Sequence, residues 1–166
     1  MDEILLLILT ILPPLLILVF IVQSDKFPEP KKTIILAFFL GVLLSIPAMF
    51  LNNLFEFQLE DTSLAAATAG FIEEPLKFLI LFLFFSKRKE FNEPMDGIVY
   101  AVCISLGFAT VENISYVYFI YADETFHTAI VRALLAIPLH AFCGIIMGFY
   151  LGIHVFKKTP NYLYFS

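Results

Sequence analysis

Three apolar stretches of the sequence contain side chains that can carry out acid–base or metal chemistry. A carboxylate with a neighbouring basic group can hold and deprotonate a water molecule, and a buried glutamic acid can also donate a proton. Hydrolysis of a peptide bond needs both steps. The side chains concerned are Glu73, Glu74 and Lys77 in the first stretch, Glu112 and Asn113 in the second, and Arg132 and His140 in the third.

The acidic and imidazole side chains also form an acceptable set of metal ligands. Zinc accepts histidine nitrogen and carboxylate oxygen, and a catalytic zinc site keeps one position for water. We take Glu74, Glu112 and His140 as the expected ligands of a divalent metal, with zinc as the expected ion. Without a metal, Glu112 and His140 would instead polarise the scissile carbonyl. Glu73 and Glu74 both remain candidates for activating water, because neighbours on a helix point about 100° apart.

Two basic residues accompany these groups. Lys77 follows Glu73 by one helical turn and Glu74 by three residues, so it can pair with either carboxylate. We interpret Lys77 as a counter-charge, with the role of a nucleophile as the alternative. Arg132 lies about one turn inside its apolar stretch, where it can either extend to the membrane surface or hold the backbone of a substrate near the site. Of these two, we favour extension to the surface.

The composition indicates that a lipid bilayer is the main solvent of this chain. Of its 166 residues 60% are hydrophobic and only 15% are charged, and the mean hydropathy is +0.90. The apolar residues form long runs, which are typical of membrane spans. The formal net charge is −5 and the basic residues sit in short clusters between these runs, so the sequence gives no sign of nucleic-acid binding.

A helix needs about 20 apolar residues to cross the hydrocarbon core, and five stretches of the sequence meet this requirement. We therefore predict an all-α integral membrane protein, a bundle of about five transmembrane helices that forms one domain over residues 1–166. The first stretch has an acidic start and no small-residue cleavage site, so we expect it to stay as a span. The predicted spans are residues 4–22, 33–51, 64–85, 97–121 and 128–156.

The charged residues between the spans predict one orientation. Basic residues follow the first, third and fifth spans, and the other two loops contain acidic residues and no Lys or Arg. The positive-inside rule then places the N-terminus outside and the C-terminus in the cytoplasm. The basic residues are Lys26, Lys31, Lys32, Lys87, Arg88, Lys89, Lys157 and Lys158, and the acidic ones are Glu56, Glu60, Asp61, Asp123 and Glu124.

The charged side chains inside the spans predict a shared buried site. Each ionisable residue near a helix centre costs about 2.5–3.5 kcal/mol on insertion, so the stretch 64–85 must turn its charges toward partners. Glu73, Glu112 and His140 lie about nine to twelve residues below the outer ends of their spans, which is roughly 13–18 Å at about 1.5 Å per residue. Three helices therefore present polar groups at one level, slightly toward the outer half.

The last span carries two further local signals. Pro138 frees the carbonyl of Leu134 from its helical hydrogen bond, which either serves the site or only kinks the helix. Gly144, Gly148 and Gly152 recur every four residues and form a small-residue face. We expect this face to press the helix of His140 against the third or fourth span.

Read together, three segments of the chain resemble the successive motifs of the PrsW family of intramembrane proteases, a branch related to the CAAX prenyl endopeptidases and bacteriocin-processing proteins. The segments are FIEEPLKFL, DGIVYAVCISLGFATVENISYV and RALLAIPLHAFCGIIMGFYLG, within roughly residues 70–152. The family motifs EExxK, FxxxE and a downstream His fall on Glu73, Glu74 and Lys77, on Phe108 and Glu112, and on His140.

This resemblance implies a protease embedded in the cell membrane, often described as a metalloprotease. The best-known member of the family makes the first cut in a membrane-anchored anti-sigma factor, on the extracytoplasmic side. The resemblance thus implies a single-span membrane protein as the substrate, and the outer-half depth of the polar groups agrees with the side of the cut. In the related CAAX group a His replaces Glu112 and a polar residue replaces Gly144, so we do not expect the mechanism of that group to transfer.

Two other classes of function fit the same residues. Buried Glu, Lys and His side chains also build proton relays, so a proton- or ion-coupled transporter or channel is one alternative. The sequence shows no inverted repeat and few spans, which is weak support for a transporter. A non-catalytic scaffold of the same fold, in which the charged cluster is a structural network, is the other.

Overall fold

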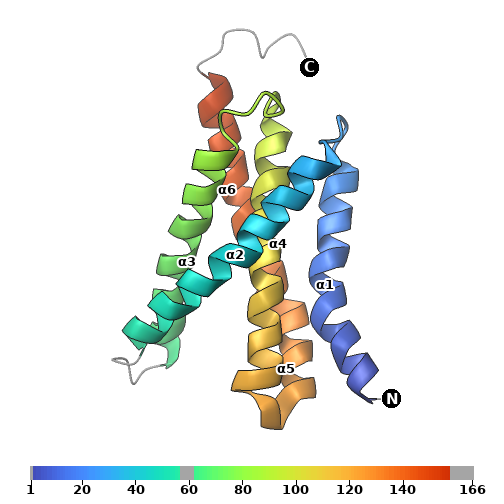
Figure 1. The fold of residues 1–166 in the computed structure, drawn as a ribbon, viewed down its shortest axis with the longest axis vertical. Coiled ribbons are helices and arrows are strands. Elements are labelled where there is room, and N and C mark those ends of the chain that lie inside the picture. The colour runs from blue at the N-terminus through green and yellow to red at the C-terminus, as the bar shows by residue number, and fades with distance from the viewer. Residues whose placement is uncertain (1, 57–61, 158–166) are drawn as a thin grey trace.

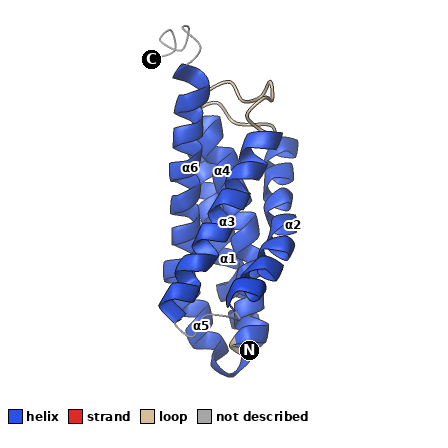
Figure 2. Ribbon diagram, turned by 90° about the vertical axis from the view of Figure 1, so that its left-hand side faces the viewer, coloured by secondary structure: helices blue, strands red, loops and turns tan. Residues whose placement is uncertain are grey.

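The computed structural model describes residues 2–56 and 62–157, and its elements are helices (Figures 1 and 2). Three of the charged residues used to predict the orientation lie outside the described residues, namely Glu60, Asp61 and Lys158. The α-helices are α1 (Asp2–Ser24), α2 (Lys31–Glu56), α3 (Thr62–Phe84), α4 (Pro94–Ser115), α5 (Thr125–Val131) and α6 (Ile137–Lys157). The shorter elements are the π-helices η1 (Tyr116–Ile120) and η3 (Arg132–Ala136) and the 3₁₀ turn η2 (Ala122–Glu124).

Five long helical segments result, because η1 continues α4 and the elements α5, η3 and α6 follow one another without a break. Four of the five are long and apolar enough to cross a membrane, as the composition predicted. The remaining helix, α3, has 23 residues and is long enough to span the hydrocarbon core. It carries three charged residues in its middle, so its role as a fifth span stays a prediction. The four candidate spans are Glu3–Ser24, Lys31–Leu54, Pro94–Ile120 and Ala122–Lys157.

Helix α4 is the centre of the bundle. In Figure 1, α2 crosses in front of α4, while α1 and α3 lie on opposite sides of it, and α6 packs along α4 over most of its length. Almost every side chain of α4 from Val99 to Ala109 is buried, whereas α1, α2 and α6 carry many exposed Leu, Ile and Phe side chains. Apolar residues on outward faces suit a lipid surround, and the polar groups of α4 are turned inward.

The glycines of α6 bring it against α4, which confirms the predicted small-residue face and identifies the neighbour. A Cβ added at Gly148 would lie 2.2 Å from the backbone oxygen of Gly97, closer than any real Cβ contact. One added at Gly144 would lie 3.0 Å from the side chain of Ser105. This close approach holds the helix of His140 directly beside α4.

The crossing of α2 over α4 also depends on glycines, which the sequence analysis did not identify. A Cβ at Gly41 would lie 2.0 Å from the backbone oxygen of Ile104, and one at Gly107 would lie 2.1 Å from that of Phe38. The two backbones therefore touch, and the second half of α2 passes beside Phe108 and the turns that follow it.

The π-helix η3 precedes Pro138 in the last span. Pro138 cannot donate the hydrogen bond that the Leu134 carbonyl would accept in an α-helix, and the turn widens so that Ile137 N–H bonds to the Arg132 carbonyl. In an ideal α-helix, residues eight positions apart point about 80° apart, but a π turn contains one extra residue, which removes most of this offset. Arg132 and His140 consequently face the same side of the helix.

Candidate active site

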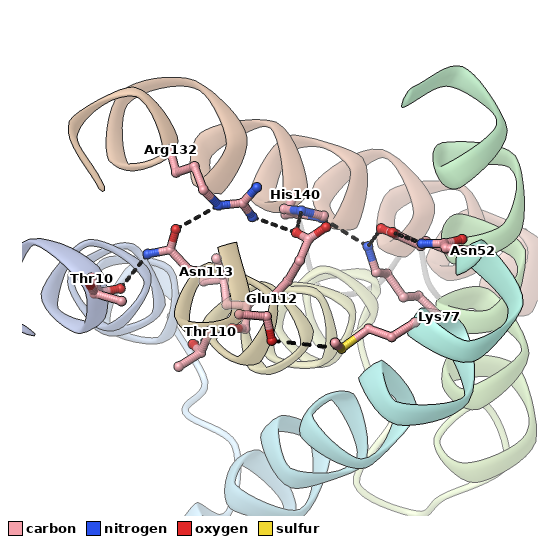
Figure 3. A network of polar contacts seen from close by, with 12 residues as sticks. Thr10, Asn52, Lys77, Thr110, Glu112, Asn113, Arg132 and His140 are labelled. Atoms are coloured by element: carbon pink, nitrogen blue, oxygen red, sulfur yellow. Dashed lines mark hydrogen bonds and ion pairs between the residues drawn. The ribbon is translucent and has the colours of Figure 1, made fainter. Parts of the chain in front are cut away.

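A continuous network of polar side chains crosses the core of the bundle (Figure 3). It runs from α1 through α4, η3 and α6 to α3 and α2, and each contact joins residues from different helices or from adjacent turns of one helix. In order, it contains the Thr10 carbonyl, Asn113, Arg132, Glu112, His140, Lys77, the pair Glu73 and Glu74, and Asn52.

Glu112 is the acceptor at the middle of the network. Its Oε2 atom lies 2.7 Å from the NH2 group of Arg132 and 2.8 Å from Nε2 of His140. The Arg132 guanidinium also donates from Nε to Asn113 Oδ1 at 2.8 Å, and Asn113 donates in turn to the Thr10 carbonyl at 2.6 Å. Glu112 is therefore held by Arg132 of η3 and His140 of α6, and Arg132 is anchored in turn through Asn113 to α1.

Lys77 is the donor that connects α3 to this centre. Its Nζ atom lies 2.7 Å from Glu74 Oε1, 3.5 Å from Glu73 Oε2 and 3.0 Å from His140 Nδ1. The lysine is fully buried, and its ammonium group lies 4.1 Å from the centre of the Phe108 ring. A charged lysine only donates, so Nδ1 of His140 accepts and Nε2 carries the proton that is donated to Glu112.

The two adjacent glutamates of α3 have different surroundings. The Glu73 side chain is 5% exposed and accepts a hydrogen bond from Asn52 Nδ2 at 2.9 Å, whereas the Glu74 side chain is 31% exposed and pairs with Lys77. One oxygen of Glu73, one oxygen of Glu112 and one ring nitrogen of His140 lie within 4.8 Å of one another. The structure thus groups Glu73 with Glu112 and His140, where the sequence analysis had placed Glu74.

A cavity of about 400 Å³ adjoins these groups. Glu73 and Glu112 reach its wall, beside the Asn52 side chain, and the rest of the lining combines polar and apolar residues of α2, α4 and η1. The Asn52 Oδ1 atom is buried and has no donor among the described residues, so it can accept a hydrogen bond from a water or ligand in this space. The further lining residues are Met49, Asn53, Phe108, Ser115, Tyr116, Phe119 and Ile120.

The donor set suits a divalent metal ion. Zinc accepts both carboxylate oxygen and imidazole nitrogen, and its catalytic sites have three protein ligands and one position for water. Glu73, Glu112 and His140 come from three different helices and converge beside a cavity that can admit water. In the network as a whole, the carboxylates of Glu73, Glu74 and Glu112 outnumber the basic side chains of Lys77 and Arg132, which also favours binding of a cation.

Arg132 does not extend to the membrane surface, so the interpretation favoured from the sequence is wrong. Its side chain is only 11% exposed, and the guanidinium lies 4.2 Å from the centre of the Tyr116 ring. The π turn η3 rotates Arg132 toward the face of the helix that carries His140, and Glu112 and Asn113 provide acceptors there. The sequence alone contains no sign of this turn except Pro138.

Asn52 is the site residue that the sequence analysis missed. It lies near the end of α2, one residue beyond the predicted span 33–51, where a polar residue reads as the start of a loop. One feature of the sequence could have indicated this residue: Asn52 and Asn53 form a polar pair inside the apolar stretch Lys31–Leu54. Because α2 extends to Glu56, Asn52 is still helical and reaches Glu73.

Comparison with known proteins places this chain in a family. Three relatives, each described as "Protease PrsW", come from Bacillus subtilis, Geobacillus kaustophilus and Clostridioides difficile. They are 39%, 39% and 35% identical over 146, 152 and 161 residues, which cover 86%, 89% and 93% of this chain. The same alignments cover 65%, 66% and 68% of the relatives, so the chain spans about two thirds of their length. No solved structure matches the chain.

The family profile agrees with the structural findings. The profile described as "PrsW family intramembrane metalloprotease" matches residues 29–165, a region that contains α2 to α6 and the converging Glu73, Glu112 and His140. Together with the four candidate spans, this match makes the protein a multi-pass membrane protein. The chain belongs to the PrsW family of intramembrane metalloproteases.

Proposed function

We propose that this chain is an intramembrane endopeptidase that hydrolyses a peptide bond in a membrane-anchored protein. One observation carries the proposal: Glu73, Glu112 and His140 converge from three helices, beside a cavity whose wall includes the two glutamates. Burying charged side chains in a bilayer is costly, so charged side chains that converge beside a cavity are expected to be functional. Membership of the family supplies the class of reaction.

In this proposal Glu73, Glu112 and His140 hold a divalent metal ion, with zinc as the favoured ion. A metal bound there would make a coordinated water acidic and polarise the carbonyl of the scissile bond. Arg132 would keep Glu112 in place by donating to its Oε2. Outer partners of this kind fix the orientation of metal ligands. A metal bound at His140 Nε2 would leave the ring proton on Nδ1, so Lys77 would then donate to Glu74 and not to the ring.

Glu74 is the proposed proton carrier. It is the carboxylate of the network outside the ligand group, and its side chain is partly exposed. In the proposed reaction a Glu74 carboxylate oxygen takes a proton from the attacking water and passes it to the amide nitrogen of the leaving chain. Lys77 Nζ donates to Glu74 Oε1 at 2.7 Å and so orients this carboxylate.

The cavity suits a short unwound segment of a transmembrane substrate. A helix must open locally before a bond in it can be cut, and the freed backbone groups then need partners inside the membrane. Asn52, Asn53 and Ser115 provide polar side chains in the lining, and Phe108, Phe119 and Ile120 provide apolar contacts. We propose a single-span membrane protein as the substrate, with an anti-sigma factor as the favoured class.

The proposed orientation has the N-terminus outside and the C-terminus in the cytoplasm, as the distribution of basic residues favours. With this orientation, the α4–α5 turn faces the outside and the cavity, whose lining includes η1, lies toward the outer half of the membrane. The cut is then expected near the extracytoplasmic side of the substrate's span.

The test uses the full chain in liposomes with a single-span substrate that carries a different tag at each end. We expect two fragments whose masses place the cut in the outer half of the span. Glu112→Gln and His140→Gln should give no fragments, whereas Glu124→Gln, a control at a side chain that is 71% exposed, should cut like the wild type. Equal cutting by all four proteins would refute the proposal. An anti-sigma factor and an unrelated single-span protein, compared at equal concentration, test the substrate class.

A further inference from the structure

A second group of carboxylates lies away from the active site, at the end of the bundle where α1 is joined to α2 and α3 is joined to α4. Figure 1 shows both connections at the end opposite α5. Two of the carboxylates belong to the α1–α2 connection, and two lie at the start of α4. They are Asp25 and Glu29 in the connection, and Glu93 and Asp96 at the helix start.

Three of these residues converge on one point. One oxygen from each of Asp25, Glu93 and Asp96 lies within 4.8 Å of the others. The two aspartates are nearly inaccessible, with 6% of Asp25 and 0% of Asp96 exposed. The convergence therefore occurs inside the protein, beneath the α1–α2 connection.

Each buried aspartate is fixed through one oxygen and leaves the other oxygen unsatisfied. Asp25 Oδ1 accepts from the backbone N–H of Phe27 at 3.0 Å, and Asp96 Oδ2 accepts from those of Asn92 and Glu93 at 2.6 and 2.8 Å. The remaining atoms, Asp25 Oδ2 and Asp96 Oδ1, are buried and have no hydrogen-bond donor among the described residues. A buried carboxylate oxygen without a donor is costly and calls for a positive partner.

No basic side chain of the described residues forms an ion pair with these carboxylates. The adjacent Lys26 lies over the Phe27 ring instead, with its Nζ atom 5.7 Å from the ring centre. Glu29, beside these residues, accepts a hydrogen bond from the Tyr100 hydroxyl. The cluster thus brings together carboxylates that no basic side chain of the described residues pairs with.

We infer that Asp25, Glu93 and Asp96 form a binding site for a hard divalent cation, Mg²⁺ or Ca²⁺. Both ions prefer carboxylate oxygen ligands, and this group contains no nitrogen or sulfur donor. Two backbone N–H groups and the Phe27 N–H fix the aspartates through one oxygen each, and the other oxygen of each aspartate stays available to a cation. The bound ion connects the α1–α2 loop to the first turn of α4 and so stabilises that end of the bundle.

The site differs in chemistry and in position from the proposed catalytic centre, so it stands whether or not the protein is a protease. The first test uses full-length protein in detergent, stripped with EDTA, and follows thermal unfolding while Mg²⁺ or Ca²⁺ is added. We expect a saturable rise of several degrees in the midpoint of unfolding. The ion with the lower half-saturation concentration identifies the cation.

Variants assign this rise to the carboxylates. Asp25→Asn and Asp96→Asn keep the hydrogen bonds that each side chain accepts through one oxygen, and they should abolish the rise. Glu90→Gln removes an equal charge from the neighbouring α3–α4 loop and should leave it unchanged. No rise in the wild type, or an equal rise in both Asn variants, would overturn the inference. So would a rise that is lost in His140→Gln and kept in Asp96→Asn.

A second measurement does not depend on the stability of the variants. Tb³⁺ replaces Ca²⁺ in oxygen sites and emits when a nearby tyrosine is excited, and the chain contains no Trp that would confuse the signal. Tyr100 contacts Glu29 beside the site. We expect Tb³⁺ emission in the wild type that excess Ca²⁺ or Mg²⁺ removes, and at least a several-fold weaker emission in Tyr100→Phe. Emission that is unchanged in Tyr100→Phe and Asp96→Asn would place the ion elsewhere and contradict the inference.

Discussion

His140 Nε2 lies 2.8 Å from Glu112 Oε2, so a hydrogen bond joins two residues 28 positions apart in the chain, in the core of the bundle. The other nitrogen of the same ring receives Lys77 at 3.0 Å. Both ring nitrogens therefore have a partner, Glu112 on α4 and Lys77 on α3. His140 thus connects Glu112 to Lys77 and, through Lys77, to Glu73 and Glu74. The proposed function depends on this histidine most.

Replacing His140 by Gln should lower kcat/KM for substrate cleavage by about 100-fold or more, because a metal ligand and the contact to Glu112 are lost together. Metal bound per protein should fall in parallel, as measured by elemental analysis of the purified protein. His154→Gln is the matched control, since that histidine is exposed near the end of the same helix. Full activity and metal content in the His140 variant would remove it from the site.

Replacing each of the two glutamates of α3 should affect metal binding and activity in different ways. Glu73→Gln removes a proposed ligand, so we expect both the metal content and the activity to fall. Glu74→Gln leaves the ligand group intact, so it should keep the metal and lose kcat by about 10²–10⁴-fold, which is the usual contribution of a general acid–base residue. Elemental analysis and cleavage rates on the same samples measure the two effects. The opposite result would mean that Glu74 is the metal ligand and that Glu73 is the acid–base residue.

Lys77→Met should destabilise the protein, because Lys77 is the basic side chain that pairs with Glu73 and Glu74 in the described structure. Removing one partner of a buried ion pair costs about 3–5 kcal/mol, since the other charge stays buried. Thermal unfolding in detergent measures the loss, and Lys89→Met at an exposed position is the control. The double variant Lys77→Met with Glu73→Gln should regain part of the lost stability, and a purely additive result would mean that the pair does not interact.

Gly148→Ala should weaken the packing of α6 on α4. The added Cβ would lie 2.2 Å from the backbone oxygen of Gly97, and backbone cannot move aside as a side chain end can. We expect a loss of about 1–3 kcal/mol in the free energy of unfolding, as for other overpacked contacts. Gly70→Ala on α3 meets nothing within 4 Å and should be neutral or slightly stabilising. If both variants unfold at the same temperature, α6 does not approach α4 this closely.

Several features of the site follow from the sequence because they depend on single segments. The insertion cost of Glu73, Glu74 and Lys77 in one apolar stretch requires polar partners, wherever these lie. Counting residues from the loop ends put Glu112 and His140 at a similar depth, and the structure brings them into contact. Depth along a helix scales with residue number, so it can be predicted without knowing how the helices pack.

Other features depend on the direction in which each helix faces. Arg132 points inward because the π turn before Pro138 adds a residue to the helix, and Asn52 reaches Glu73 because glycine contacts press α2 onto α4. The carboxylates of the α1–α2 connection meet the start of α4 only when the bundle is assembled. None of these directions is encoded in the local pattern of apolar residues.

Composition, span length and depth are properties of each segment alone. The order of residues was therefore enough to identify a helical membrane protein, the side chains that are costly inside the membrane and the depth at which they lie. Packing between the helices set the remaining features: Glu73 rather than Glu74 joins Glu112 and His140, Arg132 turns inward, and Asn52 takes part. The physical reason is rotation: a change of about 100° about a helix axis exchanges neighbouring residues, and that angle is set by contacts between helices.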